Sequence, residues 1–103
     1  MSGTDASSVA RAEIRVTGRV QGVGYRDYAR RCAARAGVTG YTMNLDDGSV
    51  RVVAEGARAL LEALIVELER GPRLARVERM AVDWTAARGE FTEFSIRHGD
   101  RDN

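Results

Sequence analysis

The residues best suited to chemistry lie in one short stretch, Gly18-Arg19-Val20-Gln21-Gly22-Val23-Gly24-Tyr25-Arg26. Its glycines allow successive backbone N–H groups to turn inward and form a concavity that binds anions. A helix beginning at Tyr25 would add the partial positive charge of its N-terminus. Arg26 would lie in the first turn of that helix, where a cation is unfavourable by about 0.3–1 kcal/mol unless an anion binds beside it. The stretch therefore predicts a pocket for a phosphate or a carboxylate.

The spacing of these glycines leaves a second interpretation open. It is not the dinucleotide-binding fingerprint, and the stretch lacks the Gly-Lys-Ser/Thr ending of a nucleotide P-loop. An ordinary glycine-rich connection between a strand and a helix would show the same pattern.

Hydrophobic periodicity predicts the elements on either side of this stretch. Residues 13–17 alternate polar and apolar, which is typical of a half-buried strand. From Tyr25 the period becomes helical, and Gly37 is expected to end the helix. The apolar stripe of this helix consists of Tyr25, Tyr28, Ala29, Cys32, Ala33 and Ala36. We therefore expect Cys32 to be a small core residue and not a reactive thiol.

The second half of the chain continues with two strands, a helix and two strands. Residues 38–43 and 49–54 flank Asp46-Asp47-Gly48, which predicts a hairpin whose aspartates are turn residues and not a catalytic pair. A helix is expected over residues 57–70, ended by Gly71-Pro72. Its apolar face consists of Leu60, Leu61, Leu64, Ile65 and Leu68. Strands are expected at 77–84 and 91–97.

This order predicts an α+β protein with a ferredoxin-like βαββαβ sandwich. The sheet is expected to be antiparallel, with both helices on one face and a short extra C-terminal strand. We expect one domain over residues 12–98, between flexible tails at 1–11 and 99–103. The fold by itself does not decide the function.

Composition excludes several classes of function. The 103 residues carry 16 basic side chains, all arginine, against 15 acidic ones, so a formal net charge of +1 gives no general attraction to nucleic acid or to an anionic membrane. One cysteine, Cys32, and one histidine, His98, cannot form a disulfide framework or a thiolate or histidine metal cluster. We expect His98 to be exposed at the start of the tail. The absence of a leader or of a long apolar run leads us to expect a cytoplasmic protein that is not membrane-bound.

Two motifs resemble those of the acylphosphatase family. The first is Gly18–Arg26, and the second is Gly40-Tyr41-Thr42-Met43-Asn44 with the following Asp47-Gly48-Ser49-Val50 and Ala54-Glu55-Gly56. The ending Phe94-Ser95-Ile96-Arg97 is also similar. Tyr41 and Met43 depart from the tryptophan and the basic residue that the family usually has there, which bears on substrate preference and stability.

The resemblance implies hydrolysis of the carboxyl–phosphate anhydride of acyl phosphates, without metal or cofactor. It assigns Arg26 and Asn44 as the catalytic residues. It assigns the phosphate-binding backbone to Gly18, Arg19, Val20, Gln21, Gly22 and Val23. The implied partners are a small acyl phosphate substrate and inorganic phosphate, as product and inhibitor, and we expect a monomer without nucleic-acid or membrane partners.

The residues suit this chemistry. A carboxylate is a good leaving group because its acid has a pKa near about 4–5, so no strong general acid is needed. Arg26 can hold two phosphoryl oxygens, and Asn44 has both an acceptor and donors with which to orient a water molecule. Without the resemblance, an asparagine beside a turn is more often structural.

Two other functions remain as alternatives. One is a non-catalytic module of the same fold that binds an anion or a phosphorylated partner, and such a module would not need Asn44. The other is a single-stranded nucleic-acid binder, which the balanced charge disfavours.

Overall fold

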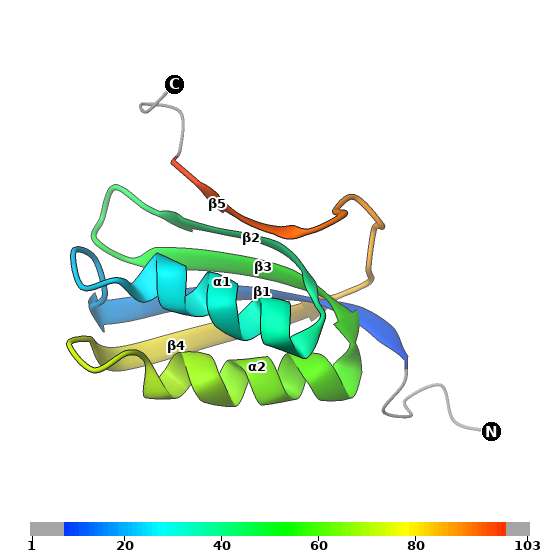
Figure 1. Ribbon diagram of the computed structural model, residues 1–103, viewed down its shortest axis with the longest axis horizontal. Coiled ribbons are helices and arrows are strands. Elements are labelled where there is room, and N and C mark those ends of the chain that lie inside the picture. The colour runs from blue at the N-terminus through cyan, green and yellow to red at the C-terminus, as the bar shows by residue number, and fades with distance from the viewer. Residues whose placement is uncertain (1–7, 99–103) are drawn as a thin grey trace.

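The computed structural model describes residues 8–98 and consists of two helices packed on one face of a five-stranded sheet (Figure 1). The elements in chain order are β1 (Val9–Arg19), α1 (Tyr25–Ala36), β2 (Thr39–Asn44), β3 (Val50–Ala57), α2 (Arg58–Arg70), β4 (Arg76–Thr85) and β5 (Phe94–Arg97). The predicted ferredoxin-like α+β sandwich is confirmed.

The strand order in the sheet is β4-β1-β3-β2-β5. The first four strands pair antiparallel, as expected, whereas β5 pairs parallel to β2 at the edge. The complete sheet is therefore mixed. Sequence periodicity could not show this, because the direction of β5 depends on how residues 86–93 cross from β4 to the far edge of the sheet (Figure 1).

The core lies between the helices and one face of the sheet. Every second residue of the central strands points into it: Ala12, Ile14 and Val16 of β1, and Val50, Val52 and Ala54 of β3. The helices contribute Tyr25, Ala29, Cys32, Ala33, Leu61, Leu64 and Leu68. Cys32 is a buried core residue, as predicted. Leu60 was expected on the buried face of α2 but is 41% exposed, because it lies to one side of the stripe at 61, 64 and 68.

The first strand begins earlier than the sequence indicated. Residues 9–11, which the sequence predicts to be part of the N-terminal tail, belong to β1 and pair with 55–57 of β3. Arg11 is only 5% exposed, so the polar pattern of this segment does not reflect exposure to solvent. The rest of the two predicted tails, 1–7 and 99–103, lies outside the described residues. None of the helices in the described part of the chain is long and apolar enough to cross a membrane.

Candidate active site

The connection between β1 and α1 forms a loop with an unusual backbone. Gly22 and Gly24 have φ angles of 77° and 80°, and a Cβ atom at either position would meet no neighbour within 4 Å. Glycine is therefore needed here for the backbone conformation and not for space. Gly24 is the N-cap of α1 and no side chain caps this end of the helix. The first N–H groups of α1 thus remain available as donors to a ligand.

Asn44 reaches the same end of the sheet from another part of the chain. It is the last residue of β2 and pairs with Val50, on the face of the sheet that carries the helices. A hollow of about 310 Å³ lies between this strand end and the start of α1. Its lining consists of Val20, Gly22, Gly24, Tyr25, Arg26, Asp27, Asn44, Ile96 and His98. The structure therefore brings Arg26, Asn44 and the glycine loop together.

Arg26 has no carboxylate partner among residues 8–98. Its neighbour Asp27 binds Arg30 and Arg31 instead, with N–O distances of 2.7 and 3.0 Å. The hydrogen bond from Arg30 is the main reason why the pKa of Asp27 lies below its usual value. The carboxylate nearest to Arg26 in sequence is thus neutralised elsewhere, and the positive charge of Arg26 remains available at the hollow.

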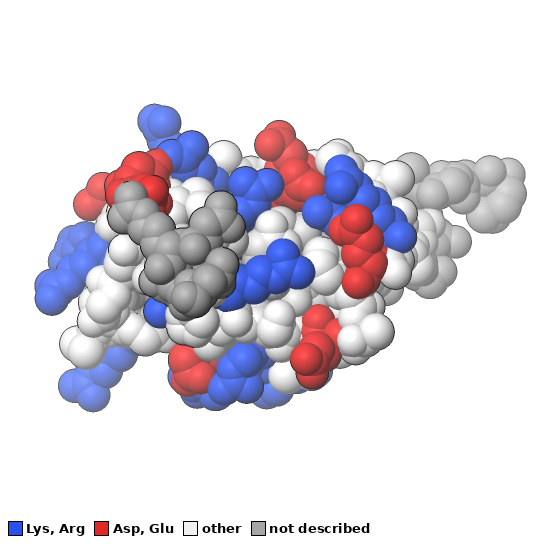
Figure 2. Space-filling view, turned by 90° about the horizontal axis from the view of Figure 1, so that it is seen from above, with Lys and Arg blue, Asp and Glu red and all other residues white. Residues whose placement is uncertain are grey.

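The chain as a whole carries no large excess of one charge. On the face shown in Figure 2, arginines are interspersed with aspartates and glutamates. The formal net charge is +1. Attraction of an anion to the hollow must therefore come from the local groups, namely Arg26, the loop N–H groups and the N-terminus of α1.

The side-chain oxygen of Asn44 is the second free polar group at this place. Its Oδ1 atom is buried and accepts no hydrogen bond from the described residues. Buried acceptors are usually paired, so an unpaired one calls for an explanation. An unpaired acceptor on a residue that lines the same hollow as Arg26 suits a ligand that brings its own donor.

The Gln21 side chain links the glycine loop to the turn after Asn44. Its Nε2 atom donates to the backbone oxygens of Leu45 and Ser49, at 2.9 and 2.8 Å. The turn itself is closed by a hydrogen bond from Leu45 N to Ser49 O, at 2.8 Å. Asp47 accepts the Ser49 N–H at 3.0 Å, which agrees with the prediction that it is a turn residue.

The other predicted phosphate-binding residues lie close by but not all at the hollow. Gly18 and Arg19 are the last residues of β1 and pair with Val77 and Arg76 of β4. Val23 is half-buried and packs against the core.

Ile96 and His98, which sequence analysis left out of the site, line the hollow. His98 is exposed, as expected. Its position at the site follows from the pairing of β5 with β2, for which no local pattern gave a signal.

A second hollow, of about 650 Å³, is larger but chemically less suited to an anion. It is lined by Arg15, Thr17, Glu78, Arg79 and Ala81, which alternate with core residues and so lie on the sheet face away from the helices. Arg15 is paired with Asp47, and Glu78 adds a negative charge. Neither glycine loop nor helix N-terminus contributes to its lining. Size therefore does not identify the site here.

Within residues 8–98, no group of three or more His, Cys, Asp or Glu side chains is placed to hold a metal ion. At the hollow itself the acidic side chain is that of Asp27, which is engaged by two arginines.

Comparison with known proteins identifies the family. The acylphosphatase family model matches residues 12–96. An acylphosphatase of Salinibacter ruber is 52% identical over 87 residues, which cover 84% of this chain and 92% of that protein. One of Thermus thermophilus is 55% identical over 69 residues, covering 67% and 78%. The crystal structure of the Bacillus subtilis acylphosphatase superposes with a TM-score of 0.83 at 31% identity, covering 85% of this chain and 98% of that one. The chain with the Arg26–Asn44 hollow belongs to the acylphosphatase family.

Proposed function

We propose that this acylphosphatase hydrolyses acyl phosphates in the hollow between α1 and β2, with Arg26 binding the phosphoryl group and Asn44 orienting the attacking water. The observation that carries the proposal is the meeting, around one hollow, of an arginine without a carboxylate partner, a free amide oxygen and a glycine loop. Arg26 lies in α1, Asn44 ends β2, and the glycines lie in the loop between β1 and α1. The packing of the core does not by itself require that Arg26 and the Asn44 oxygen lack partners.

Binding of the phosphoryl group needs several donors that point to one place. The guanidinium of Arg26 can hold two phosphoryl oxygens with parallel N–H bonds. Backbone N–H groups of the Gly18–Val23 stretch and of the first turn of α1 would bind the remaining oxygen, helped by the helix dipole. A dianion here also relieves the unfavourable position of Arg26 in the first helical turn.

The hydrolytic step then requires a positioned water molecule. Asn44 Oδ1 accepts one proton of the water in a hydrogen bond and directs the water oxygen toward phosphorus. The new P–O bond forms while the bond between phosphorus and the bridging anhydride oxygen breaks. The electron pair leaves with the carboxylate, and the proton lost by the water passes to a phosphate oxygen. Charge on the phosphoryl oxygens is stabilised by donors that are already in place, so neither a metal nor a general acid is required.

The leaving group sets the substrate class. A carboxylate departs without protonation, whereas the alkoxide of an alkyl phosphate needs acid assistance that the proposed pair does not supply. We therefore expect rapid hydrolysis of benzoyl phosphate and negligible hydrolysis of a simple alkyl phosphate, measured by phosphate release with the purified chain.

The variant Asn44→Ala separates hydrolysis from anion binding. Since Asn44 contacts the water and not the phosphate, kcat should fall about 100-fold while the inhibition constant of inorganic phosphate changes by about twofold or less. Circular dichroism serves as the folding control. A variant that keeps wild-type turnover would show that Asn44 does not position the water, and the site would then be better described as an anion-binding module.

A further inference from the structure

We infer that Gln21 is a positioning residue that sets the separation between the phosphate-binding loop and Asn44, an inference that rests on the proposed roles of Arg26 and Asn44. Gln21 lies between Val20 and Gly22, both of which line the hollow, but is not itself part of the lining. Its side-chain amide donates hydrogen bonds to the β2–β3 turn, and among the described residues it has no hydrogen bond to Arg26 or Asn44.

The two hydrogen bonds of Gln21 join both ends of that turn. Leu45 follows Asn44 directly, and Ser49 is the residue before β3. One side-chain NH₂ group has two hydrogens, so a single amide can donate to both carbonyl oxygens at once. The distances of 2.9 and 2.8 Å indicate two good bonds, and Ser49 is only 1% exposed. One residue of the loop therefore fixes the backbone position immediately after Asn44.

This link matters because the phosphate-binding loop and Asn44 come from different parts of the chain. Arg26 follows the loop after β1, whereas Asn44 ends β2, and β3 lies between these two strands in the sheet. A water held by Asn44 must face a phosphorus atom held by Arg26 and the loop. A misplacement of about 1 Å in such an arrangement can lower the rate about 100-fold. Gln21 connects these two parts through the four covalent bonds from its Cα to Nε2 and the two hydrogen bonds that Nε2 donates, which is a short path.

The same turn is also held from the other side of the sheet, which provides a matched control. Arg15 donates through Nε to the Ser49 hydroxyl at 3.3 Å and forms an ion pair with Asp47. Arg15 does not line the hollow with Arg26 and Asn44. An Arg15→Met variant therefore removes polar contacts to the turn without removing the link between the turn and the loop.

The decisive experiment is a double-mutant cycle between Gln21→Met and Asn44→Ala. Methionine has nearly the size of glutamine but cannot donate. We expect Gln21→Met to lower kcat about 10-fold, with the phosphate inhibition constant changed less than about twofold, because the loop keeps its donors. In the Asn44→Ala background the same substitution should change kcat by about twofold or less, since there is no longer an amide to misplace. Arg15→Met should leave kcat near the wild-type value.

Each alternative result would overturn the role assigned to Gln21 or the role assigned to Asn44. If Gln21→Met lowers kcat equally in both backgrounds, or lowers only the melting temperature, Gln21 does not act through Asn44 and the inference is wrong. If Asn44→Ala itself leaves kcat unchanged, the proposed role of Asn44 fails first and the role of Gln21 fails with it. Should Gln21→Met not fold, Gln21→Glu makes the same test, because a carboxylate cannot donate and repels both carbonyl oxygens.

Discussion

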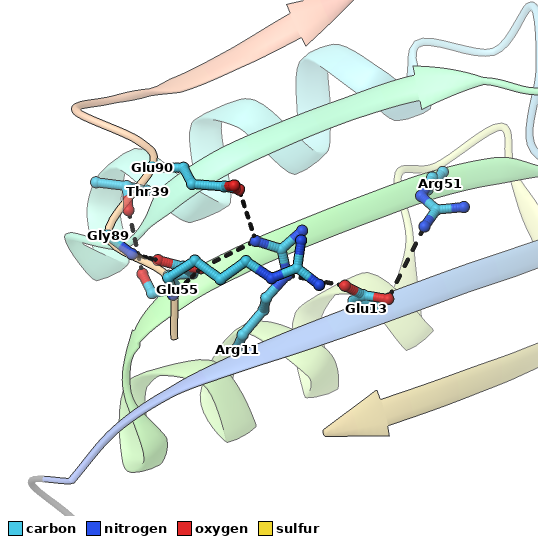
Figure 3. Close-up of polar contacts among 8 residues, drawn as sticks. Arg11, Glu13, Thr39, Arg51, Glu55, Gly89 and Glu90 are labelled. Carbon is cyan, nitrogen blue, oxygen red and sulfur yellow. Dashed lines mark hydrogen bonds and ion pairs between the residues drawn. The ribbon is translucent and has the colours of Figure 1, made fainter. Parts of the chain in front are cut away.

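Two arginines of this protein, Arg11 and Arg26, occupy opposite electrostatic situations. Arg11 is buried on the sheet face away from the helices and binds three carboxylates, those of Glu13, Glu55 and Glu90, at 2.8, 3.0 and 3.1 Å (Figure 3). Arg26 faces a hollow and has no carboxylate partner in the described part of the chain. Both carry a permanent charge. The difference indicates that Arg11 serves the fold, whereas Arg26, which lines the hollow together with Asn44, remains available to a ligand.

The Arg11 cluster explains how the last strand is placed. Glu55 accepts hydrogen bonds from Arg11 and from the backbone N–H groups of Arg88 and Gly89, at 2.9 and 3.0 Å. These bonds fasten the segment between β4 and β5 to the sheet (Figure 3). The same segment carries Phe91, whose ring lies 5.8 Å from that of Tyr41. The cluster thus contributes to the site indirectly, by directing β5, with Ile96, to its place beside β2.

The largest effect that tests this comparison is the loss of activity in Arg26→Ala. We expect kcat/KM to fall about 1000-fold, because a donor to the developing phosphoryl charge is removed. The unfolding free energy should be unchanged or higher by about 0.3–1 kcal/mol, because the substitution removes a cation from the first turn of α1. Arg26→Lys should recover little, since an ammonium group lacks the two-pronged geometry. Steady-state kinetics and urea unfolding measure the two quantities, and a large loss of stability would mean that Arg26 is structural.

The substitution Arg11→Met should have the opposite effect: it should lower the unfolding free energy and leave kcat nearly unchanged. Removing one partner leaves buried Glu55 without its cation, and such changes cost about 3–5 kcal/mol. We expect a loss of that order in urea unfolding, with kcat per folded molecule within about twofold of the wild type. If Arg11→Met abolishes catalysis while the protein stays fully folded, the division into a structural and a functional arginine is incorrect.

A smaller effect should appear in the pH dependence of stability. Burial raises the pKa of Glu55, but the Arg88 N–H, Arg11 and the Gly89 N–H lower it by more, so the pKa in the folded state lies below the ordinary value of 4.5. The ionised carboxylate therefore stabilises the fold above about pH 4.5, and this stabilisation is lost as the pH falls through the folded-state pKa. The difference in unfolding free energy between wild type and Glu55→Gln should be about 2 kcal/mol at pH 7 and should shrink below pH 4.5. A difference that stays constant between pH 7 and pH 3 contradicts this account.

Removal of metal ions should have the smallest effect. If the positive charge at the site comes from Arg26, the loop and the α1 N-terminus, benzoyl phosphate hydrolysis in EDTA should equal that in buffer within the error of the assay. Activity that disappears in EDTA and returns with Mg²⁺ would show that protein groups are not sufficient.

The local elements and the main catalytic candidates could be predicted from the sequence because their signals are local. Glycine positions mark the loop and the end of α1, and Gly37 does cap that helix through its N–H to Ala33 and Ala34. Arg26 and Asn44 belong to motifs that resemble those of one family, and the fold brings both to one hollow.

What the sequence did not indicate depends on contacts between distant residues. The burial of Arg11 could not be foreseen, because its three carboxylate partners lie 2, 44 and 79 residues away. His98 reaches the site only because β5 pairs with β2. Gln21 was expected to contribute its backbone, yet its side chain spans 24 and 28 residues to the β2–β3 turn.

Titration of the labelled protein with inorganic phosphate tests most directly whether an anion binds beside Arg26 and not in the larger hollow. We expect the NMR signals of the amides from Val20 to Asp27 and of the Arg26 guanidinium to shift most, with saturation at one site. Arg15, Thr17 and Arg79 around the larger hollow should shift little. Shifts centred on those three residues, with Arg26 unaffected, would contradict the account.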